Sequence, residues 1–219
     1  MVSFLTTNAN GAYPLLRRPG LRRMAGLTYR AIADRIFDLL NKVDTAGYIE
    51  RQQLGFDESS NEYQASPVYK IKSLLRNVPI DPRKFTLIDL GCGKGRVLVI
   101  ARRFSFRRII GVELSESLAR VARENCRGFD NVSIVVCNGA TFAFPDGPCV
   151  LYLANPFEAS VLASVLDNVK ERLSRDDSPI YIVYVVPQHR QLLDGAPFLK
   201  LVPSLKYCAM YVSAPLGEE

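Results

Sequence analysis

Three glycines at alternate positions mark the stretch of this sequence best suited to binding chemistry. Gly91, Gly93 and Gly95 follow a short apolar run at residues 85–90, and Asp89 lies two residues before the first of them. The apolar run predicts a buried strand, and the residues after Gly95 predict a helix. Glycine tolerates positive φ and lets the backbone approach a bound molecule closely. Strand, glycine turn and helix in this order are typical of the ligand-binding corner of a doubly wound α/β sheet.

An acidic residue ends the second predicted strand, at residues 108–113. A carboxylate such as Glu113 at that place can accept hydrogen bonds from both ribose hydroxyls of a nucleotide. The glycine spacing separates two cofactor classes, because the dinucleotide fingerprint G-x-G-x-x-G requires a glycine where this chain has Arg96. A nicotinamide oxidoreductase is therefore disfavoured. A tight turn followed by an unrelated surface glutamate is the structural alternative.

The sequence Asp-Leu-Gly-Cys-Gly-Lys-Gly at residues 89–95 resembles the first motif of class I S-adenosylmethionine-dependent methyltransferases. The resemblance covers about residues 63–213. It implies S-adenosyl-L-methionine as cofactor and S-adenosyl-L-homocysteine as product. It also implies a cofactor site with these members: Tyr63, Ser66, Asp89, Gly91, Cys92, Gly93, Gly95, Glu113, Leu114, Asn138, Gly139 and Ala140.

The adenine contact departs from the family pattern. Many of these methyltransferases carry an acid after the third strand that contacts the adenine amino group. Here Gly139 falls at that position, with Asn138 beside it. We expect the Asn138 side chain or the backbone of Ala140 to make this contact instead.

The segment from Tyr63 to Pro67 precedes the first strand and has two interpretations. It resembles the Tyr-x-x-(small)-Pro entry of some protein-lysine methyltransferases, which places Tyr63 and Ser66 at the entrance to the cofactor site. In the purely structural interpretation, Ser66 is the N-cap and Pro67 the first residue of a helix that continues through residues 68–75.

A second candidate for chemistry follows the fourth predicted strand, at residues 149–154. Asn155, Pro156 and Phe157 resemble the (N/D)-P-P-(F/Y) motif of methyltransferases that act on amide or aromatic amino nitrogens. An Asn carbonyl can hold the N–H groups of such a nitrogen so that its lone pair faces the methyl donor, and the aromatic ring stacks on the flat target. This chain has one proline in place of two, which puts a planar amine in doubt. The structural alternative is a capping box of Asn155, Pro156 and Glu158.

The resemblance implies a Rossmann-like α/β fold with a seven-stranded, mostly parallel sheet, its last strand antiparallel, and helices on both faces. The later strands are expected at residues 132–136, 180–186, 199–202 and 207–213, with helices from residue 115, at 161–173 and near 189–193. Residues 1–62 are expected to be an extension, made of a loose arm at 1–20, an amphipathic helix at 21–43 and a loop at 44–62. That helix is expected to present Leu27, Ile32, Ile36, Leu39 and Leu40 on its apolar face, as the wall of a cleft or as cover for the sheet. Residues 63–219 are expected to form the catalytic domain.

Composition narrows the function further. The 219 residues include five scattered cysteines and one histidine, which predicts free thiols in a reducing, cytoplasmic setting and makes a multi-histidine metal site impossible. No apolar run is long enough to span a membrane. The net charge is +6, and five arginines precede the first acidic residue, which allows nucleic-acid binding through the N-terminal segment.

These features lead to one preferred function and two alternatives. We expect transfer of a methyl group to a nitrogen, on a lysine or amide of a protein. The alternatives are a small-molecule or RNA acceptor, and a module that binds the cofactor without catalysis.

Overall fold

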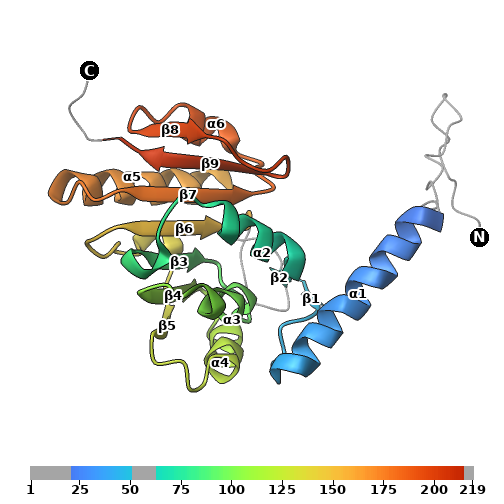
Figure 1. Ribbon diagram of the computed structural model, residues 1–219. Helices are drawn as coiled ribbons and strands as arrows, with labels where there is room; N and C mark the ends of the chain where they lie inside the picture. Colours follow the sequence, from blue (N-terminus) through green and yellow to red (C-terminus); the bar gives the residue numbers. More distant parts are fainter. Residues whose placement is uncertain (1–20, 51–62, 215–219) are drawn as a thin grey trace, which may run out of the picture.

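A seven-stranded sheet forms the centre of the molecule (Figure 1). The computed structural model describes residues 21–50 and 63–214, with the backbone alone for residues 21–30. The strand order is β5-β4-β3-β6-β7-β9-β8. The strands are β3 (Thr86–Leu90), β4 (Arg108–Glu113), β5 (Val132–Val136), β6 (Cys149–Leu153), β7 (Ile180–Val185), β8 (Leu199–Val202) and β9 (Cys208–Ser213). The last strand, β9, runs antiparallel to both of its neighbours, β7 and β8, while the pairings among β5, β4, β3, β6 and β7 are parallel, so the predicted architecture is confirmed.

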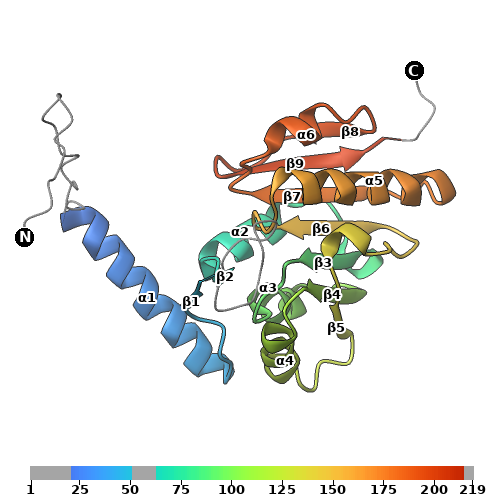
Figure 2. The same cartoon turned by 180° about the vertical axis from the view of Figure 1, so that it is seen from behind.

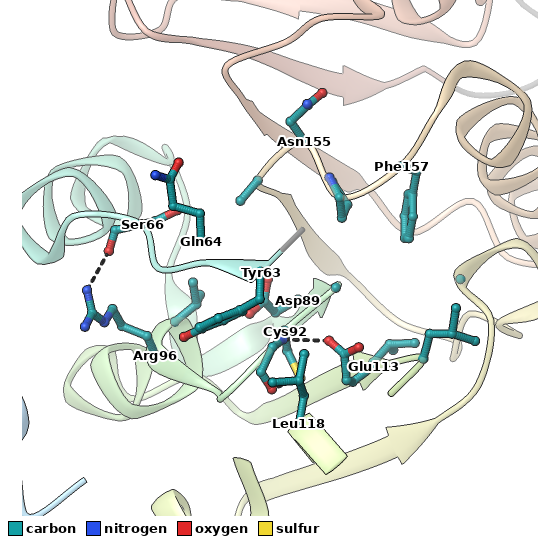
Figure 3. A pocket seen from close by; sticks show the side chains of 18 of the residues that line it. Tyr63, Gln64, Ser66, Asp89, Cys92, Arg96, Glu113, Leu118, Asn155 and Phe157 are labelled. Atoms are coloured by element: carbon teal, nitrogen blue, oxygen red, sulfur yellow. Dashed lines mark hydrogen bonds between the residues drawn. The ribbon is translucent and has the colours of Figure 1, made fainter. Parts of the chain in front are cut away.

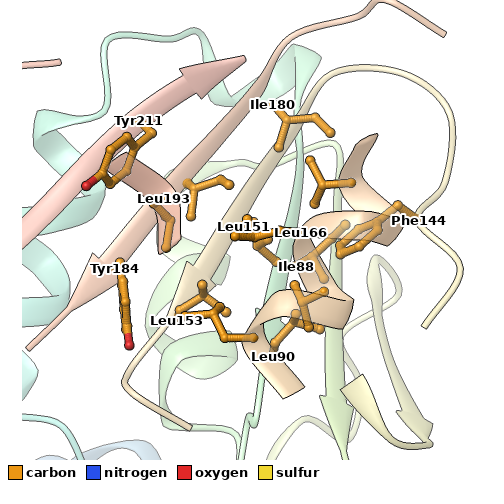
Figure 4. Close-up of a cluster of buried hydrophobic side chains, with 14 of the residues drawn as sticks. Ile88, Leu90, Phe144, Leu151, Leu153, Leu166, Ile180, Tyr184, Leu193 and Tyr211 are labelled. Atoms are coloured by element: carbon orange, nitrogen blue, oxygen red, sulfur yellow. The ribbon is translucent and has the colours of Figure 1, made fainter. Parts of the chain in front are cut away.

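Helices cover both faces of the sheet (Figures 1 and 2). One face packs on α2 (Val68–Asn77), α3 (Arg96–Ala101) and α4 (Glu116–Asn125), and the other on α5 (Ala159–Arg175) and α6 (Arg190–Asp194). Neighbouring residues of β3 alternate between the two cores. Leu87 belongs to the cluster beneath α2 and α3, and Ile88 belongs to the cluster beneath α5, shown in Figure 4. Because the central strands are buried on both faces, they appear in the sequence as continuous apolar runs.

The strand order creates a switch point between β3 and β6. From β3 the chain moves outward through β4 to β5, and it then returns to the other side of β3 to form β6 and β7. Crossover connections therefore leave β3 and β6 on opposite sides, which opens a crevice at the carboxyl ends of the strands. The loops after β3, β4, β5 and β6 all meet at this edge.

The N-terminal helix α1 (Leu21–Asn41) confirms the predicted helix but reverses its expected orientation. Its apolar residues Ile32, Ile36, Leu39 and Leu40 are 53%, 51%, 78% and 76% exposed. The opposite face contains Asp34 and Phe37, which are buried. The predicted packing of the apolar stripe is therefore wrong. The face that docks on the rest of the protein carries the carboxylates of Asp34 and Asp38, which pair with the buried Arg96. Leu27 lies where side chains are not described.

A short ribbon interrupts the predicted loop at residues 44–62. Strand β1 (Tyr48–Ile49) pairs antiparallel with β2 (Tyr63–Gln64), so part of this segment is ordered against the start of the expected catalytic domain. The prediction of a continuous loop is wrong for its first part. Residues 51–62 and the predicted loose arm at 1–20 lie outside the described residues, as do the arginine side chains of the basic N-terminal segment.

Two predicted helix caps are wrong. Helix α2 begins at Val68 with Pro67 as its N-cap, and the Ser66 side chain makes no capping bond. Helix α5 begins at Ala159 with Glu158 before it, so Asn155 lies upstream of the helix. Asn155 accepts a hydrogen bond from the Tyr184 hydroxyl instead (3.0 Å).

Within the described residues, no helix is long and apolar enough to cross a membrane.

Candidate functional site

The glycine loop between β3 and α3 adopts a backbone that other residues rarely accept. The φ angles of Gly91, Gly93 and Gly95 are +76°, +54° and +81°. Side chains at these positions would also collide with the protein itself, because a Cβ on Gly91 would lie 2.5 Å from Pro156 Cβ and one on Gly93 would lie 2.2 Å from Tyr63 Cε2. The loop therefore needs glycine both for its conformation and for close packing.

Two buried carboxyl groups flank this loop. Asp89 on β3 is 2% exposed and Glu113 at the end of β4 is 4% exposed. Burial, with a smaller contribution from the Glu113 charge, raises the pKa of Asp89 to about 8. Burial also raises the pKa of Glu113, opposed by hydrogen bonds from backbone amides. Glu113 Oε2 accepts from Gly93 N (2.7 Å) and Oε1 from Ser115 N (2.9 Å), so this acid fixes the shape of the loop.

Most of the predicted site residues line one cavity at the carboxyl edge of the sheet (Figure 3). Those that do are Tyr63, Ser66, Asp89, Gly91, Cys92, Gly93, Glu113, Leu114, Asn138, Gly139, Asn155, Pro156 and Phe157. Gly95 and Ala140 do not line it. Gly95 faces α4, where a Cβ on this glycine would lie 3.2 Å from the Cβ of Ala122. It therefore serves the packing of the loop against that helix.

The corner after β6 holds the second candidate motif. Asn155 has a φ of +52°, in the left-handed region that Asn tolerates better than most residues. The hydroxyl of Tyr184 donates to Asn155 Oδ1 and accepts from the backbone N–H of His189 (3.3 Å). Phe157 is buried with its ring against Gly139, where a Cβ would approach Phe157 Cζ to 2.6 Å. The turn after β5 is thus packed against the motif after β6.

The turn after β5 places Asn138 differently from a simple adenine contact. Its Oδ1 accepts a hydrogen bond from Ala140 N (2.9 Å) and caps the short 3-10 turn Gly139–Thr141. Asn138 is exposed and still borders the cavity. One acceptor position of Asn138 Oδ1 is therefore taken by the Ala140 N–H, while the Asn138 side chain still borders the space where a ligand would lie.

Sequence spacing missed three residues near the site. Gln64 lines the cavity, as Asn155 does, and both side chains are drawn in Figure 3. Arg96 is 3% exposed and its Nη1 pairs with Asp34 Oδ1 (2.8 Å). Thr45 is fully buried beside the loop. No periodicity or motif marks these residues, because their contacts depend on the tertiary fold; Arg96, for example, meets Asp34, which lies 62 residues away in the chain.

The cavity has features that suit a nucleoside carrying an amino-acid tail. Its two acids can accept from hydroxyl or ammonium groups, and its Cys92 wall is neutral because burial raises the pKa of that thiol. Within residues 21–50 and 63–214, no group of three or more His, Cys, Asp or Glu side chains could hold a metal ion.

Residues 87–176, which contain the glycine loop, both acids and the Asn155 corner, match the family described as "Methyltransferase domain". Over these 90 of its 219 residues the chain resembles a methyltransferase domain. The match favours the methyltransferase over the nicotinamide oxidoreductase among the alternatives that the sequence left open. It covers the sheet from β3 to α5, where the strands that carry the candidate site are found.

Curated relatives resemble the chain over part of their length. The chain is 29% identical over 110 residues to the ribosomal protein L11 methyltransferase of Clostridium perfringens, covering 49% of this chain and 34% of that protein. It is 32% identical over 100 residues to the 4-amino-L-phenylalanine/4-methylamino-L-phenylalanine methyltransferase of Streptomyces pristinaespiralis, covering 44% and 32%. The chain thus aligns with about a third of the length of these relatives.

Solved structures share the fold of the seven-stranded sheet and its helices. TrmN from Thermus thermophilus superposes with a TM-score of 0.52 at 16% identity, over 69% of this chain and 49% of that one. Geranyl diphosphate C-methyltransferase from Streptomyces coelicolor gives 0.51 at 14% identity, over 68% and 79%. At these identities the similarity establishes the Rossmann-like architecture alone.

Proposed function

We propose that this chain is an S-adenosylmethionine-dependent methyltransferase that acts on a nitrogen atom, with protein as the favoured acceptor. One observation carries the proposal. A single cavity at the carboxyl edge of a methyltransferase sheet is lined by the glycine loop, by two buried acids and by the Asn155 corner.

In this proposal the loop and the acids hold the cofactor. Each oxygen of Glu113 already accepts one backbone hydrogen bond, and a carboxylate oxygen has about two acceptor positions. Glu113 can therefore take the ribose hydroxyls without releasing the loop. Asp89 lies one strand away in the same cavity and accepts from the ammonium group of the methionine part. When bound, S-adenosylmethionine supplies a methyl group on a cationic sulfur.

The acceptor is held at the rim formed by Asn155 and Gln64. The Tyr184 hydroxyl uses one acceptor position of Asn155 Oδ1 and orients the amide. In the proposal, this oriented amide meets an N–H of the substrate and turns the lone pair of that nitrogen toward the methyl group. Positioning of this kind can supply roughly 7–11 kcal/mol of a barrier. Because the methyl donor is already activated, orientation is the main task left to the protein.

The choice of nitrogen and of protein has separate support. The Asn155-Pro-Phe corner offers amide and carbonyl oxygens, which are acceptors for N–H groups. One curated relative is named for ribosomal protein L11 and another for an amino-phenylalanine. A small-molecule or RNA acceptor and a silent cofactor-binding module are the alternatives that an experiment must separate.

A labelled-methyl assay tests the proposal. The purified chain is incubated with methyl-labelled S-adenosylmethionine and a bacterial extract, and the products are then digested with protease or ribonuclease. Label that protease releases supports a protein acceptor, while label that ribonuclease releases, or label in small molecules, replaces it with another class.

Two variants serve as matched controls. Asn155→Ala should abolish transfer yet retain binding of S-adenosylhomocysteine, and Glu113→Ala should lose binding. A parent that binds the product but transfers nothing would indicate a silent module. A parent that binds neither S-adenosylmethionine nor its product would overturn the proposal.

A further inference from the structure

The segment at residues 44–47, Asp-Thr-Ala-Gly, joins α1 to β1 and lies across the glycine loop; we call it the 44–47 strap. Lys94 Nζ pairs with Asp44 Oδ2 (3.0 Å). Asn125 on α4 accepts from Asp44 N and donates to Asp44 O, both at 2.8 Å, and it also donates to Lys94 O (2.8 Å). The strap is thus fastened to a loop that follows it by more than forty residues.

Thr45 is the hub of the 44–47 strap. Its backbone N–H donates to Asp38 Oδ2 (2.8 Å), and its hydroxyl donates to Asp38 Oδ1 (2.6 Å). The same hydroxyl accepts from Arg96 Nε (2.8 Å), at the first residue of α3. Thr45 is fully buried, so these bonds form away from water and the loss of one leaves a buried group unpaired.

The carbonyl of Thr45 determines where Tyr63 lies. The Tyr63 hydroxyl donates to Thr45 O (2.7 Å), while its ring covers Gly93 so closely that a Cβ there would meet it at 2.2 Å. Tyr63 also lines the cavity, and Figure 3 shows its ring beside Asp89 and Cys92. The position of the Tyr63 side chain is therefore fixed twice: the 44–47 strap holds its hydroxyl, and the glycine loop packs against the face of its ring.

We propose that Thr45 is a positioning residue for the cofactor site, because it ties α1 and the glycine loop to Tyr63 and so fixes the wall of the pocket that Tyr63 forms. This inference rests on the proposed cofactor and extends it to a segment outside residues 63–219. The N-terminal extension is then part of the binding site. A preformed wall saves the cost of ordering the aromatic side chain when the cofactor binds.

Variants of Thr45 that differ only in the hydroxyl test the role. Thr45→Val keeps the shape and removes the hydroxyl, and Thr45→Ser keeps the hydroxyl. We expect Thr45→Val to raise the Kd of S-adenosylhomocysteine by roughly tenfold in calorimetry, and Thr45→Ser to stay within about twofold of the parent. With a working acceptor, KM for S-adenosylmethionine should rise in Thr45→Val while kcat changes little.

Tyr63→Phe provides the second arm, since it keeps the ring and removes the bond to Thr45 O. It should weaken binding, and the double variant should cost less than the two single losses combined, because both act through the position of one ring. Tyr69→Phe, at a residue that is 66% exposed, is the matched control and should leave Kd unchanged. Additive losses, or a Thr45→Val variant that melts lower but binds as the parent does, would overturn the inference. Failure of the parent to bind at all would instead refute the proposed function.

Discussion

The pH dependence of product binding is the sharpest test of the site, because it depends on Asp89. Burial raises the pKa of this carboxyl to about 8, so at neutral pH it is mostly protonated in the ligand-free protein. An ammonium group bound next to it favours the ionised form and lowers the pKa again. Binding of S-adenosylhomocysteine should therefore release a proton from Asp89.

The size of the effect follows from the pKa. With a pKa near 8, about 0.9 of Asp89 is protonated at pH 7, so binding at that pH should release about 0.9 proton. Because the ammonium group binds the ionised form of Asp89, the apparent affinity scales with the ionised fraction of this carboxyl. That fraction, and with it the apparent affinity, is about 25-fold higher at pH 7.5 than at pH 6. Below pH 6 the affinity should continue to fall about tenfold for each pH unit.

Calorimetry in buffers of different ionisation enthalpy measures the released proton directly. The slope of the observed enthalpy against the buffer enthalpy gives the number of protons. Asp89→Asn should remove most of both the slope and the pH dependence. 5′-Methylthioadenosine, which lacks the amino-acid tail, should bind the parent without releasing the proton. A pH-independent Kd in the parent, or an unchanged slope in Asp89→Asn, would show that this carboxyl does not contact the ammonium group.

Three further outcomes are expected from unfolding measurements. The free energy of unfolding of the ligand-free parent should fall as pH rises from about 4 to about 8, because native Asp89 holds a proton that the unfolded chain has lost. The free energy of unfolding of Asp89→Asn should fall less over the same range. Equal slopes of unfolding free energy against pH in the two proteins would contradict the raised pKa of Asp89. Arg172→Met should lower the free energy of unfolding in urea by about 3 kcal/mol or more, since the fully buried guanidinium binds backbone carbonyls that would lose their partner, while Kd for the product stays unchanged. Phe37→Ala should lower the free energy of unfolding by about 3 kcal/mol or release α1 from the core, which protease cleavage would detect. Leu40→Ala, on the exposed face, should lower it by less than about 0.5 kcal/mol. Similar losses of stability in the two variants would mean that the α1 orientation described above is wrong.

The fold was predictable because its signals are local. Each central strand is a short apolar run, and the three glycines at alternate positions require a turn whatever surrounds them. Glu113 could be assigned to the edge of the sheet because parallel strands end at the same side. These inferences use only the period of side chains along a strand and the φ angles that glycine allows.

The errors arose where a local preference competed with a distant partner. Asn155 has the sequence of an N-cap, but the Tyr184 hydroxyl holds its side chain and the helix begins later. The apolar stripe of α1 was expected to pack inward, but the ion pair of Asp34 with buried Arg96 docks the opposite face. A buried cation requires its anions, and this requirement outweighs the burial of a few apolar side chains.

The sequence by itself determined the sheet, the glycine loop and the acids beside it, because their spacing along the chain is enough to define them. Only the tertiary structure decided that Thr45 and Tyr63 meet over Gly93, and that Arg96 is buried against α1. These contacts join residues that are 18 to 62 positions apart, and no periodicity connects such positions. Their geometry exists only once the sheet has brought the segments to one edge.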